Sequence, residues 1–346
     1  MVVRVRGHAL PSGEYVDLYA DGDRWTTDPV PGAELVAEGW LLPGLVDAHT
    51  HPGAEKPGDV LDHDVLRADL RQHVAAGVTL IRAPGLAGDP PGWFGLDPDV
   101  PRAFHAGPWI VQHGLFFDNW GRPTDYDRMP EVAAVQAART GWAKIVTDWG
   151  PDDPHVPLDV LKAVVDAVHE VGGRLAVHSQ VRDGGAAAVA AGVDSVEHGM
   201  CLDPDLLDQM ARQGTALTPT LAGFQRHLPD IRTKPEGPRK TWIVDGIEAL
   251  PYLAAAAVEA GVTVLAGTDS RPHGRILDEI RALAGAGMKA HDALGAASWT
   301  ARAYLGLPGL EDGAPADAVV YAEDPRADLD QLDTPVAVVL RGRRVR

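Results

Sequence analysis

The sequence of 346 residues is poor in several features, and each shortage excludes a class of protein. Its one cysteine, Cys201, permits no disulfide within the chain, which is consistent with a reducing compartment. The first residues, Met1 to Arg6, lack the apolar core of a signal peptide. No run approaches the roughly 18 uncharged apolar residues of a membrane span. We therefore expect a cytoplasmic protein with no membrane partner.

Positive charge is also scarce. The chain has 31 Lys and Arg against 49 Asp and Glu, a formal net charge of −18. An acidic surface disfavours nucleic acid and anionic membranes as partners, because both carry negative charge. The length is ample for one large hydrophobic core, or for a core domain and a small satellite.

The middle of the chain, residues 43–311, alternates strand-like and helix-like runs, which predicts a parallel α/β architecture. Eight strand candidates fit a (β/α)8 TIM barrel. An open doubly wound sheet is the alternative, but it usually has a glycine-rich loop after its first strand. The candidates are Leu41–Ala48, Val78–Arg82, Trp109–Gln112, Ala143–Val146, Arg174–Val177, Ser195–Glu197, Ala216–Pro219 and Val262–Ala266.

Short strand-like runs also occur at both ends of the chain, in residues 1–42 and 312–346. The strands of either end are too few to bury a core alone, so we expect one small β domain assembled from both ends of the chain. Two stretches, Gly85–Phe104 and Arg226–Lys240, interrupt the repeat with proline, glycine and charge. We expect both to be loops at the rim of a site, because loops after barrel strands form that rim.

The strongest functional signal is a pair of histidines after the first strand candidate. His49 and His51 are two residues apart, so in an extended chain both side chains point to the same face. Two neutral imidazoles at the end of a buried strand form half of a transition-metal site. Further potential ligands follow later strand candidates, always at the C-terminal end. They are Lys144, His178, His198 and Asp269.

These residues lie in segments that together resemble one known family. The segments are Pro43–His51, Ala143–Ile145, Val177–Ser179, Ala191–Gly199 and Gly267–Asp269, followed by Ala316–Val320 and Val338–Gly342. Together they resemble the metal-dependent amidohydrolase superfamily, and most closely its imidazolonepropionase-like and prolidase-like branch. The resemblance implies that the two chain ends form a small β-sandwich beside the barrel.

The resemblance also implies a division of labour among the ligands. In proteins with this set, one divalent ion is held by the residues matching His49, His51 and Asp269, and a second by those matching His178 and His198. The residue matching Lys144 is carboxylated and bridges both ions, which we expect to be Zn²⁺. A hydroxide held between the ions would attack a carbonyl, with Asp269 as general acid and base. This predicts a hydrolase that cleaves an amide of a small molecule.

Other residues are candidates for contact with the substrate. Trp149 follows Lys144 in a stretch that departs from relatives, and Phe116, Phe117, Trp120 and Phe224 also lie on expected rim loops. Such residues favour a narrowed apolar pocket, although they also suit packing of loop against barrel.

His113 and His273 either contact substrate or serve the structure. Arg82 either holds a carboxylate of the substrate or pairs with an acid of the barrel, and we favour the pairing.

Three alternatives to an amidase stay open. In the first, the substrate is a lactone or another ester. In the second, the metal serves a lyase or an isomerase. In the third, the protein binds a ligand without catalysis. The complete ligand set argues against the last. The sequence specifies neither the substrate nor an interface with other copies of the chain, although barrel hydrolases are frequently homo-oligomers.

Overall fold

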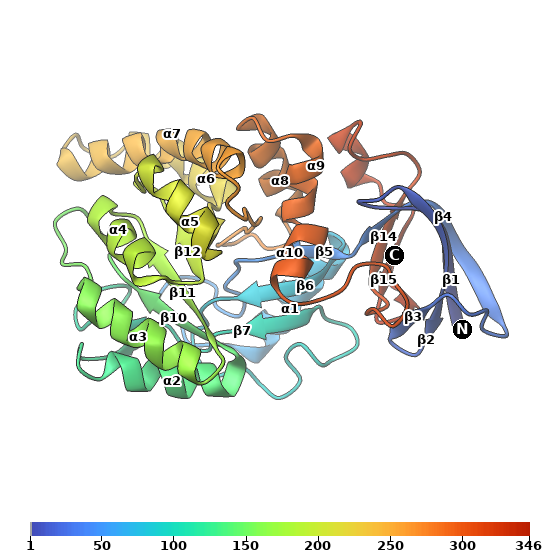
Figure 1. The fold of residues 1–346 in the computed structure, drawn as a ribbon, viewed down its shortest axis with the longest axis horizontal. Coiled ribbons are helices and arrows are strands. Elements are labelled where there is room, and N and C mark those ends of the chain that lie inside the picture. The colour runs from blue at the N-terminus through green and yellow to red at the C-terminus, as the bar shows by residue number, and fades with distance from the viewer. Residues whose placement is uncertain (1) are drawn as a thin grey trace.

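Strands from both ends of the chain form one sheet at one side of the molecule, where both termini also lie (Figure 1). The structure is a computed structural model that describes residues 2–346. The strands are β1 (Val2–Ala9), β2 (Glu14–Asp21), β3 (Arg24–Thr26), β4 (Ala33–Pro43), β14 (Ala318–Tyr321), β15 (Ala337–Leu340) and β16 (Arg343–Arg344). In this sheet β4 pairs with β1 on one side and with β14 on the other. The two chain ends therefore share one sheet, whereas a two-layer sandwich stays a prediction.

The middle of the chain contributes shorter, parallel strands. They are β5 (Leu45–Asp47), β6 (Val78–Ala83), β7 (Arg102–His105), β8 (Ile110–Val111), β9 (Arg122–Pro123), β10 (Trp142–Val146), β11 (Arg174–Ser179), β12 (Ser195–His198) and β13 (Ala216–Thr218). Their hydrogen-bonded orders are β5-β6-β7 and β13-β12-β11-β10-β8-β9. Every residue of β6, β10 and β12 is buried, as expected for parallel strands covered on both faces.

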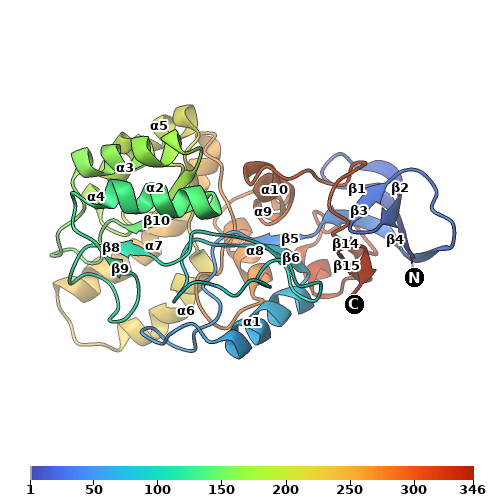
Figure 2. The ribbon, with the colours of Figure 1, turned by 90° about the horizontal axis from the view of Figure 1, so that it is seen from below.

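Helices cover the central strands. They are α1 (His63–Ala75), α2 (Met129–Thr140), α3 (Leu158–Glu170), α4 (Arg182–Ala191), α5 (Leu207–Gln213), α6 (Leu221–Arg232), α7 (Pro238–Glu259), α8 (Ile276–Gly285), α9 (Ala290–Ala296) and α10 (Trp299–Tyr304), with short 3-10 turns η1 (Pro204–Leu206) and η2 (Leu329–Asp333). Figure 2 shows α2, α3 and α4 side by side along one side of the central strands. The expected mixed α/β architecture is therefore confirmed.

The predicted first strand, Leu41–Ala48, is two strands instead of one. Leu41 and Leu42 belong to β4 and pair with β14 in the terminal sheet, whereas β5 pairs with β6. The chain changes sheets at Gly44, where a Cβ atom would lie 2.1 Å from the Thr79 hydroxyl oxygen. Only glycine fits this close approach, which hydrophobicity alone cannot reveal.

Two further expectations need correction. Residues 226–240 are largely helical, because α6 extends to Arg232 and α7 begins at Pro238. The candidate strand Val262–Ala266 is reduced to one isolated parallel bridge, Val264 to Leu217, in which Leu217 donates to the Thr263 carbonyl and accepts the Leu265 N–H, each at 2.9 Å.

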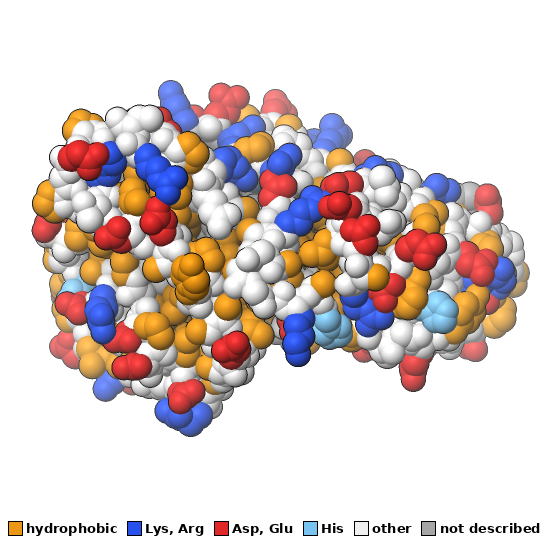
Figure 3. All heavy atoms as spheres, turned by 90° about the horizontal axis from the view of Figure 1, so that it is seen from above, with side chains coloured by type: hydrophobic (Ala, Val, Ile, Leu, Met, Phe, Trp, Pro, Cys, Tyr) orange, Lys and Arg blue, Asp and Glu red, His pale blue; other side chains and the backbone are white. Residues whose placement is uncertain are grey.

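Helix α7 is long and apolar enough to cross a membrane by length and composition, but it lies on the protein and a third of that window (33%) is buried. Figure 3, seen from above, shows hydrophobic side chains interspersed with charges of both signs over the molecule. We infer no membrane contact for this helix, because the core helices of globular proteins meet the same criteria of length and composition.

Candidate metal centre

All six predicted metal ligands line one cavity of about 410 Å³. They are His49, His51, Lys144, His178, His198 and Asp269. His49 and His51 follow β5, His198 ends β12, Asp269 ends the segment 262–269, and Lys144 and His178 lie within β10 and β11. The parallel direction of the strands brings these positions to the same region. The sequence therefore predicted which side chains meet, although they are spread over more than 200 residues of chain.

The first three ligands converge closely. The Nε2 atoms of His49 and His51 lie 3.0 Å apart, and each lies 3.3 Å from Oδ1 of Asp269. The backbone supports this arrangement, because Thr50 and Asp269 form a parallel bridge in which the Asp269 N–H donates to the His49 carbonyl at 2.7 Å.

The protonation of the two rings can be worked out from their other partners. Nδ1 of His51 lies 2.7 Å from the carbonyl oxygen of Gly85, which can only accept, so this nitrogen donates. Nδ1 of His49 lies 2.6 Å from the Glu197 carboxylate. Burial acts to raise the pKa of Glu197, but the Arg82 charge holds it well below its ordinary value, so the carboxylate accepts and His49 donates.

In neutral rings with this tautomer, both Nε2 lone pairs face each other and the Asp269 carboxylate. Two lone pairs and one anion that meet at one point repel each other unless a cation lies between them. This donor set fits a divalent metal ion, since imidazole nitrogen and carboxylate oxygen are common ligands of such ions.

The other three ligands contain buried atoms without partners. Within residues 2–346, neither Nζ of Lys144 nor Nε2 of His178 has a hydrogen-bond partner, although both are buried. Nδ1 of His198 lies 2.8 Å from the Thr220 hydroxyl, which leaves its Nε2 free for a ligand. Buried polar atoms are nearly always satisfied in proteins, so these atoms also fit a metal site.

Burial sets the protonation of this second group. It lowers the pKa of Lys144 to about 7 and that of His198 to about 3, and it holds the pKa of His178 well below the ordinary value. The centre therefore presents neutral imidazoles and an amine that is readily neutral, which are the forms that ligate or react.

Two buried residues behind the ligands were not assigned to the site from sequence. Nη2 of Arg82 donates to both carboxylate oxygens of Glu197 at 2.8 Å. The Ser195 hydroxyl also donates to the Glu197 carboxylate, at 2.6 Å. Arg82 thus pairs with a barrel acid, as we favoured, and its Nε donates to the Ala48 carbonyl at 2.6 Å. Strand alternation predicts that Glu197 and His198 point to opposite faces, yet both side chains lie beside His49 because the backbone of His198 is left-handed, so the sequence pattern does not reveal Glu197.

Three residues near the centre have left-handed backbone conformations. The φ angles are +69° at His198, +52° at Thr220 and +61° at Asp269. Residues other than glycine rarely adopt such angles, and those that do cluster at functional sites. The neighbouring Gly267 permits a close approach, because a Cβ there would lie 2.5 Å from the His49 Cβ.

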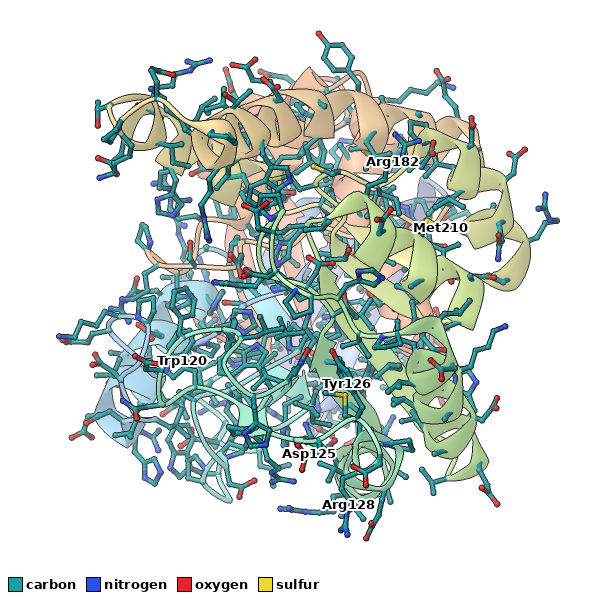
Figure 4. All side chains as sticks on the ribbon, turned by 90° about the vertical axis from the view of Figure 1, so that its left-hand side faces the viewer. Trp120, Asp125, Tyr126, Arg128, Arg182 and Met210 are labelled. Carbon is teal, nitrogen blue, oxygen red and sulfur yellow. The ribbon has the colours of Figure 1, made fainter. Side chains whose placement is uncertain are left out.

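The three predicted substrate contacts have different surroundings. Trp149 lines the cavity, and its ring centroid lies 5.2 Å from that of His178. His113 is exposed and lies 3.6 Å from the carboxylate of Asp125, on the loop before α2 that Figure 4 shows together with Trp120. His273 is buried beside Thr50 and Asp69. Neither His113 nor His273 lines the cavity.

The cavity lining contains the expected aromatic residues and further side chains that the sequence did not single out. The aromatic residues of the expected rim, Phe116, Phe117, Trp120 and Phe224, all line it, and Trp109 joins them. Three basic side chains also line it, and no local sequence pattern marks them, because they come from two separate loops and from α6. They are Lys56, His227 and Arg271.

Comparison with known proteins identifies the class. The amidohydrolase family profile matches residues 40–345, so the chain belongs to the amidohydrolase family. It is an enzyme of the class that hydrolyses carbon–nitrogen bonds, a class that generally uses divalent metals.

Individual relatives agree with this family. An uncharacterised protein of Mycobacterium tuberculosis is 40% identical over 356 residues, which cover 99% of this chain and 95% of the relative. The ochratoxinase of Aspergillus niger is 26% identical over 261 residues, 73% of this chain and 53% of the ochratoxinase.

Solved structures show the same fold at lower identity. A Xaa-Pro dipeptidase with bound methionine has a TM-score of 0.82 and 21% identity, with 99% of each chain covered. The A. niger ochratoxinase structure has a TM-score of 0.80 and 18% identity, covering 99% of this chain and 94% of the other. The fold is therefore that of prolidase-like amidohydrolases.

Proposed function

We propose that the protein is a metal-dependent hydrolase that cleaves an amide bond of a small molecule. The observation that carries this proposal is the centre itself, in which two imidazole lone pairs, a carboxylate and two unpartnered buried nitrogens line one cavity. The names of the relatives agree, since a dipeptidase and an ochratoxinase are among them.

We propose two divalent ions, Zn²⁺ in each position, with carboxylated Lys144 between them. His49, His51 and Asp269 would hold one ion, and His178 and His198 the other. The buried amine of Lys144 supports carboxylation, because only a neutral amine reacts with carbon dioxide and burial lowers the pKa of Lys144 to about 7. When bound, the ions would polarise the scissile carbonyl and make a nearby water more acidic.

The residues of this chain then supply positioning and proton transfer. Glu197 fixes the tautomer of His49 through Nδ1, and the Gly85 carbonyl does the same for His51. Asp269, an anion at the cavity wall, takes a proton from the attacking water on its carboxylate and passes it to the leaving nitrogen.

We further propose that the central strands close into an eight-stranded barrel. Isolated parallel bridges support closure: Leu86 to Pro108, Leu217 to Val264 and Thr50 to Asp269 link neighbours that the two central sheets leave unpaired. Residues 43–311 would form this barrel domain, and residues 1–42 and 312–346 the composite β-sandwich domain. The shared sheet of β4 and β14 supports the second unit.

The setting of the enzyme is also a proposal. A single cysteine and an acidic composition favour a cytoplasmic enzyme that acts on a small molecule and binds neither nucleic acid nor membrane. Whether it assembles as a homo-oligomer is tested by its mass in solution.

Metal content per chain tests the proposal first. Protein purified without added metal or chelator should contain about two divalent ions per chain by elemental analysis, and Zn²⁺ should restore activity after their removal. About one ion would indicate a mononuclear site in which Lys144 is an ordinary lysine. No ion after reconstitution would favour a protein that binds without catalysis.

The products separate hydrolysis from the alternatives. An amidase releases an acid and an amine, a lactonase one ring-opened acid, and a lyase or isomerase incorporates no water. Asp269→Asn should reduce kcat by at least about 100-fold, because general acid–base catalysis typically contributes that much. Its unfolding midpoint should change far less, and a variant that retains full turnover would remove Asp269 from the reaction.

A further inference from the structure

A second hollow lies between helix α7 and the loop that follows β12, and we call it the α7 groove. Its volume is about 570 Å³, and it shares no lining residue with the metal cavity. Met200, Cys201, Leu202 and Pro204 form its loop side. Sites for small molecules are concave, mostly apolar and about 300–1,000 Å³ in volume. The α7 groove has the size of such a site.

One stripe of α7 forms the other side of the groove. Trp242, Asp245, Ala249, Tyr252 and Ala256 line it, and they follow one another at intervals of three or four residues. Side chains at this spacing lie on one face of a helix. The stripe spans 14 residues, which at about 1.5 Å per residue is about 21 Å. The groove is therefore long and follows the helix axis.

The base of the groove is formed where the two sides meet. Met200 and Leu202 are buried, and a Cβ at Gly246 would lie 2.8 Å from Cγ of Met200. Met200 therefore packs directly against the backbone of α7. Towards solvent, the Tyr252 side chain is 78% exposed and leaves the groove open.

Asp245 is the one charged residue of the lining, and its carboxylate is exposed without an ion pair among residues 2–346. The nearest charges of α7 have other partners, since Lys240 contacts Glu236 and Glu248 contacts Arg232. The groove thus combines an apolar surface with one negative charge that nothing in the chain neutralises.

The aromatic residues of the stripe suit a cation. Trp242 lies one helical turn before Asp245, and Tyr252 lies two turns after it. Aromatic rings attract cations through their negative faces, and a nearby carboxylate adds a direct charge interaction. An anion would be repelled by Asp245, and the net charge of −18 extends this preference to the whole surface.

We propose that the α7 groove binds an amphiphilic amine, a small molecule with one positive charge and an apolar tail. The cation lies beside Asp245 and Trp242, and the tail runs over Ala249 towards Ala256. From Asp245 to Ala256 the helix rises about 16 Å, which accommodates an extended octyl chain. The proposal concerns binding alone and does not depend on the proposed hydrolysis, because the groove lies outside the metal cavity.

The test uses three probes with the same tail on the full-length, metal-loaded protein. Octyltrimethylammonium should bind saturably to one site per chain in isothermal titration calorimetry, at least about threefold more tightly than 1-octanol. Octanoate should not bind measurably. Octyltrimethylammonium has no lone pair on nitrogen, so it cannot ligate a metal ion. Equal affinities of octanoate and octyltrimethylammonium would overturn the proposal.

Variants assign binding to the groove. Asp245→Asn should weaken binding of octyltrimethylammonium about three- to fivefold and leave 1-octanol unchanged. Ala249→Phe fills the groove and should abolish binding of both probes. Glu259→Gln is the matched control, because Glu259 is an exposed acid of α7 outside the groove. Equal losses in Asp245→Asn and Glu259→Gln, or unchanged binding in Ala249→Phe, would mean that the probe binds elsewhere.

A second copy of the chain is the competing occupant of the groove. Light scattering at the titration concentrations measures the mass of the natural protein and of Ala249→Phe. An assembly that Ala249→Phe dissociates, in a protein that binds no octyltrimethylammonium, would assign the groove to a second copy and overturn the proposal. Titration of metal-free protein separates this site from the metal centre, because binding that requires the metal would place the probe in the metal cavity.

Discussion

At the scale of single residues, the proposed two-ion centre depends on Lys144. Burial lowers its pKa from 10.5 to about 7, so near neutral pH a large share of its amine is uncharged and able to form a carbamate. Lys144→Ala should therefore lose bound metal and activity together. Lys162→Ala, on the exposed face of α3, should lose neither.

The lowered pKa of Lys144 also predicts how metal uptake depends on solution conditions. Reconstitution of metal-free enzyme should improve as pH rises through about 7, where the amine of Lys144 loses its proton, and with added bicarbonate. Elemental analysis after desalting measures the uptake. If Lys144→Ala keeps two ions and full turnover, the carbamate bridge is wrong.

Glu197 should matter both for metal affinity and for stability. Glu197→Gln removes the charge that faces Arg82 and His49, all three of them buried. We expect metal affinity to fall about 10- to 100-fold and the free energy of unfolding to fall by about 3–5 kcal/mol. Metal titration and urea unfolding measure these losses.

An exposed pair of the same type provides the comparison. Glu248 contacts Arg232 with both side chains about half exposed, and such pairs contribute about 0–1 kcal/mol. Glu248→Gln should therefore change neither quantity measurably. Similar effects of the two variants would show that burial is not what makes the Glu197 pair important.

Sequence was sufficient to predict which candidate ligands line one cavity and insufficient for what surrounds them. His49, His178 and His198 each end an apolar run, so strand direction alone brings them together. The place of Arg271 in the cavity lining depends instead on its contact with Asp69 of α1, about 200 residues earlier in the chain. No local pattern reports a contact between segments so far apart in the sequence.

At the scale of elements, the start of α6 is stabilised by a residue of another helix. Thr220 precedes α6 with φ of +52° and no capping hydrogen bond from its side chain. Glu279 of α8 accepts the backbone N–H groups of Leu221 and Ala222 at 2.9 and 2.7 Å instead. Since α6 carries Phe224 and His227, this contact positions part of the cavity lining.

The protonation of Glu279 should make stability depend on pH. Burial raises its pKa from 4.5 to about 8, so between these values the folded protein binds one more proton than the unfolded chain. The free energy of unfolding should then fall as pH rises through this window, by at most about 1.4 kcal/mol per pH unit. Glu279→Gln should remove this slope.

Urea unfolding at about pH 6 and about pH 8 measures the effect. Asp278→Asn, one residue earlier on the exposed side of α8, should keep the slope of the natural protein. An identical pH dependence in Glu279→Gln and the natural protein would assign the proton to another group.

The same helix explains a wrong expectation. Residues 226–240 suggested a loop because Pro229, Pro235 and Pro238 lie among charges. In the structure Pro229 lies within α6, and Pro238 is the first residue of α7, a position that needs no backbone N–H. Packing and the remote Glu279 contact outweigh local propensity here, and neither is visible in a sequence window.

At the scale of the molecule, Asp317 links the terminal sheet to the central strands. Its carboxylate accepts Nε of Arg102 and the backbone N–H of Arg341, each at 2.8 Å, and its carbonyl accepts the Gly44 N–H at 3.2 Å. Arg302, also buried, lies 3.7 Å away. Asp317→Ala should lower the free energy of unfolding by about 3–5 kcal/mol, because it leaves Arg302 buried without a counter-charge.

Thermal unfolding measures this loss, and activity per folded molecule should change little because Asp317 does not line the cavity. Asp99→Ala removes an exposed partner of Arg343 and should leave the midpoint nearly unchanged. An equal midpoint in Asp317→Ala and the natural protein would mean that the two parts of the molecule do not depend on this contact.

The position of β4 between β1 and β14 also has a consequence for synthesis. About 275 residues separate Pro43, at the end of β4, from Ala318, at the start of β14. At roughly 5–20 residues per second, a ribosome adds them over roughly 15 to 55 s. During that interval β4 has an open edge, while the predicted metal ligands from His49 to Asp269 are synthesised. The catalytic centre is therefore translated first, and the sheet beside it is completed last.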